Sequence, residues 1–160
     1  MKTIVITGSG RGLGYELATR FRKADFNVVL NDINESQLKT AQNNLEQISG
    51  AGRVFACAGD VSSLESMQNL AAYAAEQCGE VDIWINNAGI NQPMKAIWEL
   101  SETEIRLVLD VDLKGAVFGS KVAMEHMAKQ GHGAIYNMEG YGSNDAMMLG
   151  LNMYCFLRVH

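Results

Sequence analysis

The chain has 160 residues and a net charge of -5, with 48% apolar and 19% charged residues. This length allows a substantial core and predicts one domain over residues 1–160, and the composition is typical of a globular protein. The acidic balance argues against nucleic acid or an anionic membrane as partner. No apolar run approaches the ~20 residues of a membrane span and no signal peptide precedes the first strand, so we expect a cytoplasmic location.

The first 32 residues read as strand, glycine-rich turn, helix and strand. Residues 3–7 form an apolar strand pattern that leads into GSGRGLG at residues 8–14 and then a helix. Unpaired N–H groups and the positive end of the dipole gather at a helix N-terminus and can bind a pyrophosphate. Gly8 would allow the tight turn, Gly12 would let phosphates approach the backbone, and Gly14 would let the helix pack closely on the sheet. A plain tight turn is the alternative.

Strand and helix patterns alternate along the rest of the chain. We predict further strands over residues 26–31, 53–58, 81–85 and 133–138, separated by helices. The helix after the second strand is expected to end at the glycines of residues 50–52. Ser101 and Glu104 form a capping box that opens a helix reaching about Lys129, roughly 40 Å long. Five strands with helical crossovers predict an α/β fold, a parallel sheet covered by helices on both faces.

Cysteines and histidines indicate no special chemistry. An odd number of cysteines without paired spacing predicts reduced thiols in structural roles, at Cys57, Cys78 and Cys155. The histidines lack the spacing of metal ligands, so we expect no metal site.

A second motif, Asn86-Asn87-Ala88-Gly89, follows the fourth predicted strand. Together with TGSGRGLG at residues 7–14, whose Thr7 and glycines fit the spacing TGxxxGxG, it resembles the short-chain dehydrogenase/reductase family. The resemblance implies a Rossmann-type doubly wound sheet with strand order 3-2-1-4-5 and NAD(P)-linked interconversion of a carbonyl and an alcohol. We expect a small-molecule substrate and a homo-oligomer. A methyltransferase with its own glycine-rich loop is disfavoured, because it leaves NNAG unexplained.

The resemblance also assigns cofactor contacts. Asp60 and Val61 match the family's Asp-Val pair after the third strand, where the carboxylate accepts from the adenine amino group; taken alone, Asp60 reads as a carboxylate at a helix N-terminus. The NNAG residues that would pack along the adenine side and steady the central strand are Asn87, Ala88 and Gly89. The turn residues that would cradle the pyrophosphate and adenosine are Gly8, Ser9, Arg11, Gly12, Leu13 and Gly14.

Two charges near the expected adenosine bear on the choice of cofactor. Asp32, eighteen residues past Gly14, is placed to bind the ribose hydroxyls of NAD and to repel the 2′-phosphate of NADP. Arg11 favours NADP, because a basic residue at this place often faces the phosphate in family members that use it. We predict NAD, with NADP as the alternative.

In the family, a tyrosine protonates the carbonyl oxygen, a lysine four residues later lowers the pKa of that tyrosine, a serine orients the carbonyl, and an asparagine holds a proton-relay water. Tyr154, sixteen residues after Met138, is the candidate acid, and Ser143, eleven residues before Tyr154, is the candidate orienting serine. A packing role for Tyr154 is the alternative.

Two positions depart from that pattern. Arg158 stands where lysine is expected; it can stabilise a tyrosinate but, with a pKa above about 12, it cannot pass a proton on. Asp112 takes the place of the asparagine, and it reads equally as a solvated or lysine-paired helix aspartate. The segment NMEGYGS at residues 137–143 looks somewhat like the chlorophyll(ide) b reductase branch. The apolar residues 146–151 would either line a site for a bulky substrate or pack in the core.

Family members are longer, so the resemblance covers about the N-terminal two-thirds of their fold and lacks its last strands. We expect a truncated or frameshifted reading frame, or a fragment. A nucleotide-binding fragment without catalysis therefore competes with an active enzyme as the function. The strand over residues 134–138 would then be an exposed sheet edge.

Overall fold

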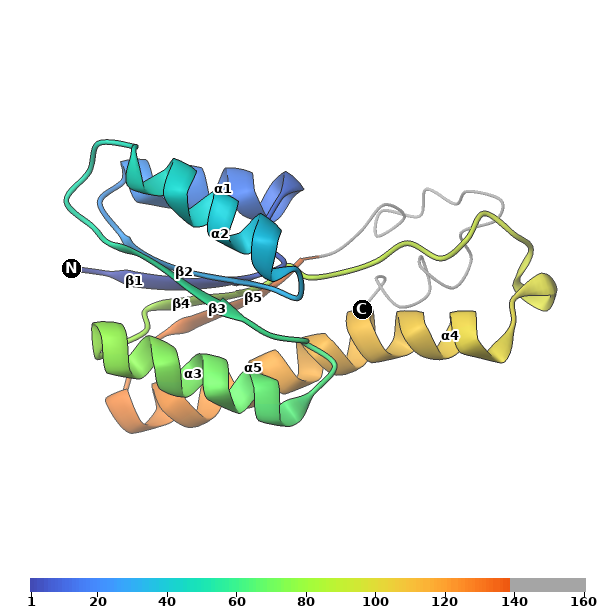
Figure 1. The fold of residues 1–160 in the computed structure, drawn as a ribbon. Helices are drawn as coiled ribbons and strands as arrows, with labels where there is room; N and C mark the ends of the chain where they lie inside the picture. Colours follow the sequence, from blue (N-terminus) through green and yellow to red (C-terminus); the bar gives the residue numbers. More distant parts are fainter. Residues whose placement is uncertain (139–160) are drawn as a thin grey trace.

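Residues 1–138 are described by the computed structural model, and they form a five-stranded parallel sheet between two layers of helices (Figure 1). The strand order is β3-β2-β1-β4-β5, which confirms the predicted doubly wound α/β fold. The prediction of one domain over residues 1–160 extends beyond the described residues and stays a prediction. The elements are β1 (Thr3–Thr7), α1 (Gly12–Lys23), β2 (Asn27–Asp32), α2 (Glu35–Glu46), β3 (Val54–Ala58), α3 (Leu64–Cys78), β4 (Ile83–Asn86), the 3-10 turn η1 (Ile97–Glu99), α4 (Glu102–Val108), the π-helical segment η2 (Leu109–Lys114), α5 (Gly115–Gln130) and β5 (Ala134–Asn137).

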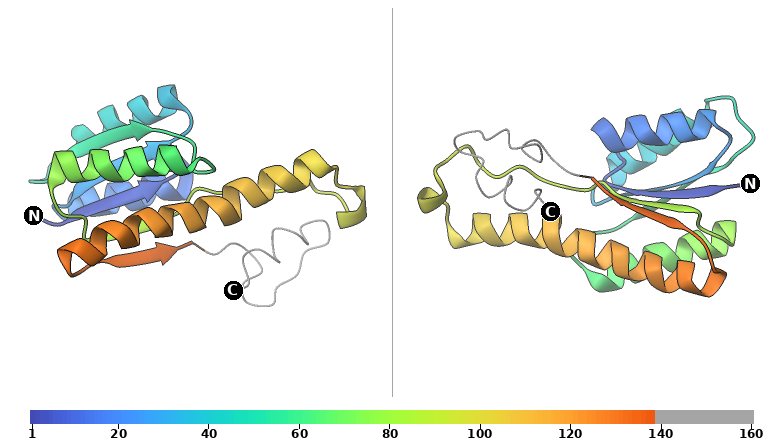
Figure 2. Two further views of the ribbon diagram at one scale, coloured as in Figure 1. Left: turned by 90° about the horizontal axis from the view of Figure 1, so that it is seen from below. Right: turned by 180° about the vertical axis from the view of Figure 1, so that it is seen from behind.

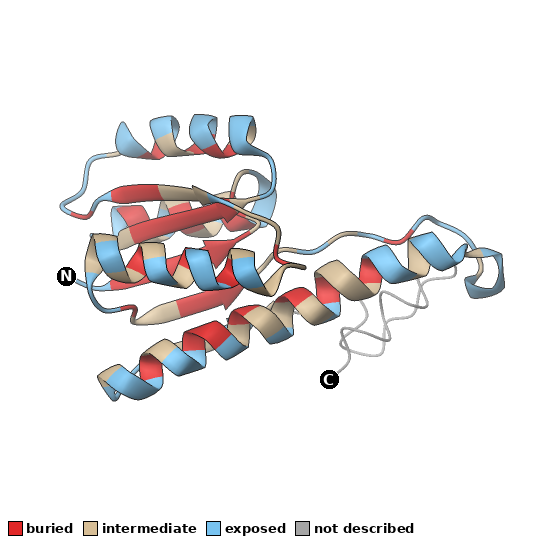
Figure 3. Ribbon diagram, turned by 60° about the horizontal axis from the view of Figure 1, so that its bottom comes forward, coloured by how far each residue is buried: buried red, intermediate tan, exposed pale blue. Residues whose placement is uncertain are grey.

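The sheet divides the core into two layers. β1 is buried at every position because helices cover both of its faces, and its sequence therefore lacks a polar side. Val5 packs in the layer beneath α3 and α5, whereas Ile4 and Ile6 pack in the layer beneath α1 and α2. The helices turn buried stripes toward the sheet and exposed faces toward solvent (Figure 3).

The observed strand boundaries lie within two residues of the predicted ones. The predicted end of the second helix is wrong by a larger margin. α2 ends at Glu46 rather than at the glycines of residues 50–52. The Ile48 N–H donates to the Leu45 carbonyl at 3.1 Å, so the last turn tightens before the loop begins.

The long helix predicted from Ser101 to about Lys129 is present as the consecutive segments α4, η2 and α5, which end at Gln130. Its capping box is confirmed, because the Ser101 hydroxyl accepts from the Glu104 N–H and the Glu104 carboxylate accepts from the Ser101 N–H. Figure 2 shows α4 and η1 extending beyond the sheet. Sequence reasoning missed the π-helical geometry of η2, a distortion that is frequent at functional sites.

Cys57 and Cys78 are free thiols, as predicted, and Cys155 lies outside the described residues. Burial raises the pKa of both thiols, which makes them poor nucleophiles. Residues 1–138 contain no cluster of three or more histidine, cysteine or acidic side chains suited to a metal ion. Of the helices in this part of the chain, none has both the length and the apolar character needed to cross a membrane.

Candidate nucleotide-binding site

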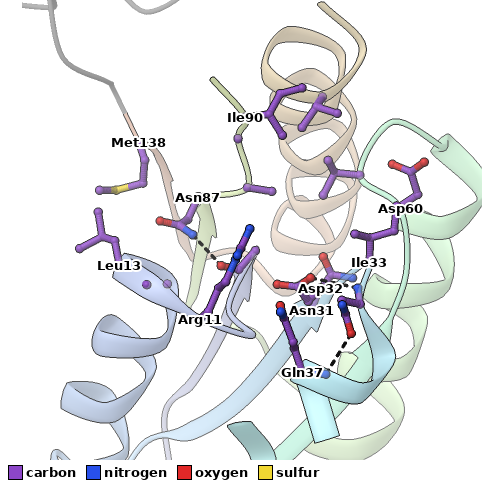
Figure 4. A pocket seen from close by; sticks show the side chains of 18 of the residues that line it. Arg11, Leu13, Asn31, Asp32, Ile33, Gln37, Asp60, Asn87, Ile90 and Met138 are labelled. Atoms are coloured by element: carbon purple, nitrogen blue, oxygen red, sulfur yellow. Dashed lines mark hydrogen bonds between the residues drawn. The ribbon is translucent and has the colours of Figure 1, made fainter. Parts of the chain in front are cut away.

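A cavity of about 640 Å³ lies at the carboxyl ends of the strands, bounded by the β1–α1 turn, the loops after β2, β3 and β4, and residues of α4 and η2 (Figure 4). Open α/β sheets bind ligands in this crevice where the strand order reverses, here between β1 and β4. Its volume falls within the ~300–1,000 Å³ of small-molecule sites. Of the predicted cofactor residues, all except Ser9 line it: Gly8, Arg11, Gly12, Leu13, Gly14, Asp32, Asp60, Val61, Asn87, Ala88 and Gly89.

The glycines of the β1–α1 turn have distinct structural roles. Gly8 and Gly12 have φ values of 62° and 59°, a region that L-residues with side chains rarely adopt. A Cβ on Gly8 would lie 2.7 Å from the Ala88 Cα, and one on Gly14 would lie 2.4 Å from the Gly8 carbonyl oxygen. A Cβ on Gly12 would meet no atom within 4 Å. Gly8 and Gly14 therefore allow close backbone packing, while Gly12 keeps the mouth of the turn open.

The N-terminus of α1 is built differently from those of the later α-helices that begin after loops. Side chains of Asn34, Ser63 and Ser101 accept N–H hydrogen bonds at the starts of α2, α3 and α4. Arg11, the N-cap residue of α1, makes no such side-chain hydrogen bond. The first-turn N–H groups of α1 thus border the cavity without a side-chain cap, an arrangement that suits a bound phosphate.

Ser9 is fully buried behind the turn. Its hydroxyl donates to the Ile6 carbonyl at 2.8 Å and accepts from the Asn31 N–H at 3.0 Å. The Ser9 side chain therefore ties the turn to β1 and β2, and does not line the cavity as the other turn residues do.

Asp32 is held at the cavity edge by two backbone groups. Its Oδ2 accepts from the Gly10 N–H and its Oδ1 from the Asn34 N–H, both at 3.0 Å. A Cβ on Gly10 would approach this Oδ2 to 2.8 Å, so Gly10 permits the contact. Sequence reasoning gave roles to the other three turn glycines and missed this one.

Asp60 and Val61 follow β3 and line the cavity, and Asp60 lies on the same side of it as Asp32 (Figure 4). The Asp60 Oδ1 accepts from the Ser62 N–H at 2.8 Å, whereas α3 is capped by Ser63. Asp60 therefore closes the turn before α3 without being its cap, and it also lines the cavity. Val61 is 8% exposed and lies so close to Gly115 that a Cβ there would be 2.8 Å from the Val61 Cγ2.

The NNAG segment is fastened to the glycine turn. The Asn87 Nδ2 donates to the carbonyls of Thr7 and Gly8 at 2.9 and 3.0 Å. The Thr7 Oγ1 accepts from the N–H groups of Asn87 and Ala88 at 3.0 and 3.1 Å. These bonds fix the ends of β1 and β4 against each other, while the predicted packing of the motif along an adenine stays a prediction.

Asp112 lies within η2 and is 8% exposed. Its Oδ1 accepts from the Ile90 N–H at 2.8 Å, which ties η2 to the loop after NNAG. Lys114 instead contacts Asp110 at 2.9 Å. The alternative of a solvated Asp112 is therefore wrong, and Lys114 is the partner of a different aspartate.

Other cavity residues carried no motif by which sequence reasoning could have found them. The apolar ones are Ile33, Ile90, Leu107, Val111 and Met138, and the polar ones are Asn31, Asn34, Gln37, Gly59 and Asn91. Met138 follows β5 and donates its N–H to the Asn86 carbonyl at 2.9 Å. The predicted catalytic residues Ser143, Tyr154 and Arg158 lie outside the described residues, so Asp112 is the one member of that set with a described position.

A doubly wound parallel sheet with a glycine turn at its switch point defines a Rossmann-type α/β protein. The family model described as short chain dehydrogenase matches residues 2–155 of the chain. The chain belongs to the short-chain dehydrogenase family.

Two curated relatives illustrate the range of proteins to which the chain is similar. The chain is 36% identical over 129 residues to glucose 1-dehydrogenase 2 of Bacillus subtilis, a match that covers 80% of this chain and 49% of the relative. It is 35% identical over 143 residues to a chloroplastic chlorophyll(ide) b reductase of Arabidopsis thaliana, covering 88% of this chain and 41% of the relative. The chain thus spans less than half of the length of either protein.

Two solved structures share the fold at similar identity. An alcohol dehydrogenase from Thermococcus sibiricus, complexed with 5-hydroxy-NADP, is 27% identical with a TM-score of 0.89, and the match covers 99% of this chain and 66% of that one. A 7α-hydroxysteroid dehydrogenase complexed with NADH and 7-oxo glycochenodeoxycholic acid is 27% identical with a TM-score of 0.88, covering 99% of this chain and 60% of that one.

Proposed function

We propose that this chain binds a nicotinamide dinucleotide and belongs to an oxidoreductase that interconverts a small-molecule carbonyl and an alcohol. The observation that carries the proposal is the N-terminus of α1, which borders the cavity without a side-chain cap and has an open position at Gly12. Both features suit a pyrophosphate. Family membership and two neighbours named with NADH or an NADP derivative support the same ligand class.

The cavity residues fit such a dinucleotide from end to end. The carboxylate of Asp32 can accept hydrogen bonds from ribose hydroxyls, and Asp60 and Val61 lie on the same side, where an adenine would be held. The opposite end, beyond the glycine turn, is lined by Ile90, Val111 and Met138, and would take the nicotinamide. A bound nicotinamide would supply or accept a hydride at the substrate carbon.

The remaining chemistry falls to side chains assigned from the family pattern. In our proposal, the Tyr154 hydroxyl donates a proton to the carbonyl oxygen and Ser143 orients that oxygen. Arg158 supplies the positive charge that favours tyrosinate, but cannot itself relay a proton. Asp112, tied to the Ile90 N–H, takes the place of the relay asparagine.

NAD is the proposed form of the cofactor. Two backbone N–H groups hold the Asp32 carboxylate where a 2′-phosphate would bring a second negative charge. Arg11 also lines the cavity and supports NADP as the alternative. The cytoplasmic location stays a prediction, because one relative is a chloroplastic protein.

A nucleotide-binding protein without catalysis is the second candidate. The substitutions at Asp112 and Arg158 favour it, because both depart from the family's proton-relay residues. The two candidates share the nucleotide site and differ in turnover, which assays with carbonyl substrates and NADH would measure.

The nucleotide site is tested by Gly12→Val, with Gly79→Val as its matched control. Both glycines have positive φ, at 59° and 79°, and open space at the Cβ position, so a valine strains the backbone at each without a steric clash. Gly12 lines the cavity, whereas Gly79 caps α3. Calorimetric titration should show NADH affinity reduced more than tenfold by Gly12→Val, about 1.4 kcal/mol or more, and retained by Gly79→Val. Retained binding in Gly12→Val would place the phosphate site elsewhere.

A further inference from the structure

Two aspartates of η2 lie in contrasting surroundings. Asp110 is 48% exposed at its side chain and forms an ion pair with Lys114 at 2.9 Å. Asp112 is 8% exposed, and its Oδ1 accepts from the Ile90 N–H at 2.8 Å. A charge near the surface is strongly screened by water and salt, whereas a buried charge acts over longer distances.

The buried aspartate is joined to the wall at one end of the cavity. Asp112 accepts a hydrogen bond from Ile90 and directly follows Val111 in the sequence. Both Ile90 and Val111 line the cavity wall. Asp32 and Asp60 lie at the other end, and Figure 4 shows Met138 and Asp60 on opposite sides of the opening. If the α1 N-terminus takes the pyrophosphate and Asp32 the adenosine ribose, the nicotinamide lies at the Ile90 end.

We infer that Asp112 is a positioning residue that makes the site prefer the oxidised form of its nicotinamide cofactor. This inference rests on the proposed function. The oxidised ring carries a positive charge and the reduced ring is neutral, so a buried carboxylate behind this end of the cavity attracts the oxidised form alone. The hydrogen bond to Ile90 keeps the carboxylate beside the wall, and the asparagine of the family pattern would provide the same acceptor without the charge.

The preference for the oxidised cofactor also determines which direction of the reaction is favoured. Tighter binding of the oxidised form lowers the reduction potential of the bound couple, by about 30 mV for a tenfold ratio of the two dissociation constants. The bound reduced cofactor is then the stronger hydride donor, and Asp112 favours carbonyl reduction over alcohol oxidation on the protein.

The test compares NAD⁺ and NADH binding in Asp112→Asn and Asp110→Asn, by calorimetric titration without substrate. Each variant removes one negative charge from η2 whatever else the side chain contacts. Asp112→Asn should weaken NAD⁺ binding relative to NADH by about three- to tenfold, whereas Asp110→Asn should change the ratio less than about twofold. Asp112→Ser, a second neutral variant with a hydroxyl acceptor, should act like Asp112→Asn and serves if that variant does not fold.

The outcomes separate the inference from the function on which it rests. Equal losses of NAD⁺ and NADH affinity in Asp112→Asn would mean a merely structural role and would overturn the inference while leaving the nucleotide site in place. Equal shifts in the Asp112 and Asp110 variants would mean a general effect of net charge and would also overturn it. If the unsubstituted chain binds neither nucleotide, the proposed function fails and the inference fails with it.

Discussion

Asp32 shows how a single side chain can be fixed before any ligand binds. Hydrogen bonds from Gly10 and Asn34 hold both of its carboxylate oxygens, so less ordering remains to be done when a ribose arrives. The same two bonds keep the negative charge in place, and the side chain is poorly able to turn away from a 2′-phosphate.

We therefore expect NADH to bind more tightly than NADPH, and Asp32→Ala to narrow the difference. Asp32→Asn removes the negative charge but keeps an oxygen that can accept from the Gly10 N–H. It therefore distinguishes the loss of charge repulsion against the 2′-phosphate from the loss of the hydrogen bond that holds the turn. Fluorescence titrations of the three proteins with both nucleotides would measure this. Equal or reversed affinities in the unsubstituted chain would mean that Arg11 determines the choice.

At the scale of elements, the start of α4 combines a capping box with an ion pair. Lys95 Nζ lies 2.7 Å from a Glu104 carboxylate oxygen. Lys95, followed by the N–H and hydroxyl of Ser101, lowers the pKa of Glu104 from 4.5 to about 2. Because the folded-state pKa is the lower one, the contribution of Glu104 to stability is complete above pH 4.5 and is lost as the pH falls toward 2.

An NMR titration of the Glu104 carboxyl should accordingly show a midpoint well below 4.5. Lys95→Gln should move the midpoint upward, since it removes the largest cause of the shift. Lys114→Gln is the matched control, because Lys114 pairs with Asp110 and should leave Glu104 unchanged. A midpoint near the ordinary value in the unsubstituted chain would show that the Lys95 contact does not persist in solution.

The helical segments α4 and η2 show which features a local sequence pattern predicts and which it does not. Ser101 and Glu104 predicted the start of α4 correctly, because a capping box is a local pattern whose two hydrogen bonds need only neighbouring residues. The π-helical turn of η2 has no local signal in the sequence. In the structure it coincides with a long-range contact between Asp112 and Ile90, twenty-two residues apart.

For the whole molecule, periodicity and turn residues were sufficient to predict five strands, and the glycine and NNAG motifs, through the family resemblance, to predict their order. The site was predicted where motifs mark it. It was missed where apolar residues such as Leu107 and Val111 reach the cavity through tertiary packing. Gly10 was missed for a related reason, because its close contact is with Asp32, which lies on β2 and is 22 residues away in the sequence. A local sequence pattern contains no information about such contacts between residues that are far apart in the sequence.

The sheet has β3 and β5 as its edges within residues 1–138. β5 pairs with β4 alone among the described strands, and Tyr136 on it is 53% exposed. An unpaired strand edge offers backbone donors and acceptors to another chain. We therefore keep the prediction that the 160-residue chain self-associates.

Light scattering with size-exclusion chromatography should show species larger than a monomer, and Tyr136→Lys should reduce them, since a lysine on an edge strand opposes pairing. Met94→Lys is the control, because Met94 is 72% exposed on a loop remote in sequence from β5. A monodisperse monomer in the unsubstituted chain would contradict the expectation of self-association.

The hydrogen bonds between Thr7, Gly8 and the NNAG segment join residues 79 to 81 positions apart. Closing so large a loop has an entropic cost that must be met before these bonds can form, so the β1–β4 pairing is expected to be slow compared with local helix formation. A nascent chain that has emerged only as far as β3 already contains the whole GSGRGLG turn, with its contacts to β1 and β2, yet lacks the Asn87 amide that bonds the Thr7 and Gly8 carbonyls. Competence to bind a nucleotide should therefore arise during folding only when β4 docks, and it would report on that step in refolding experiments.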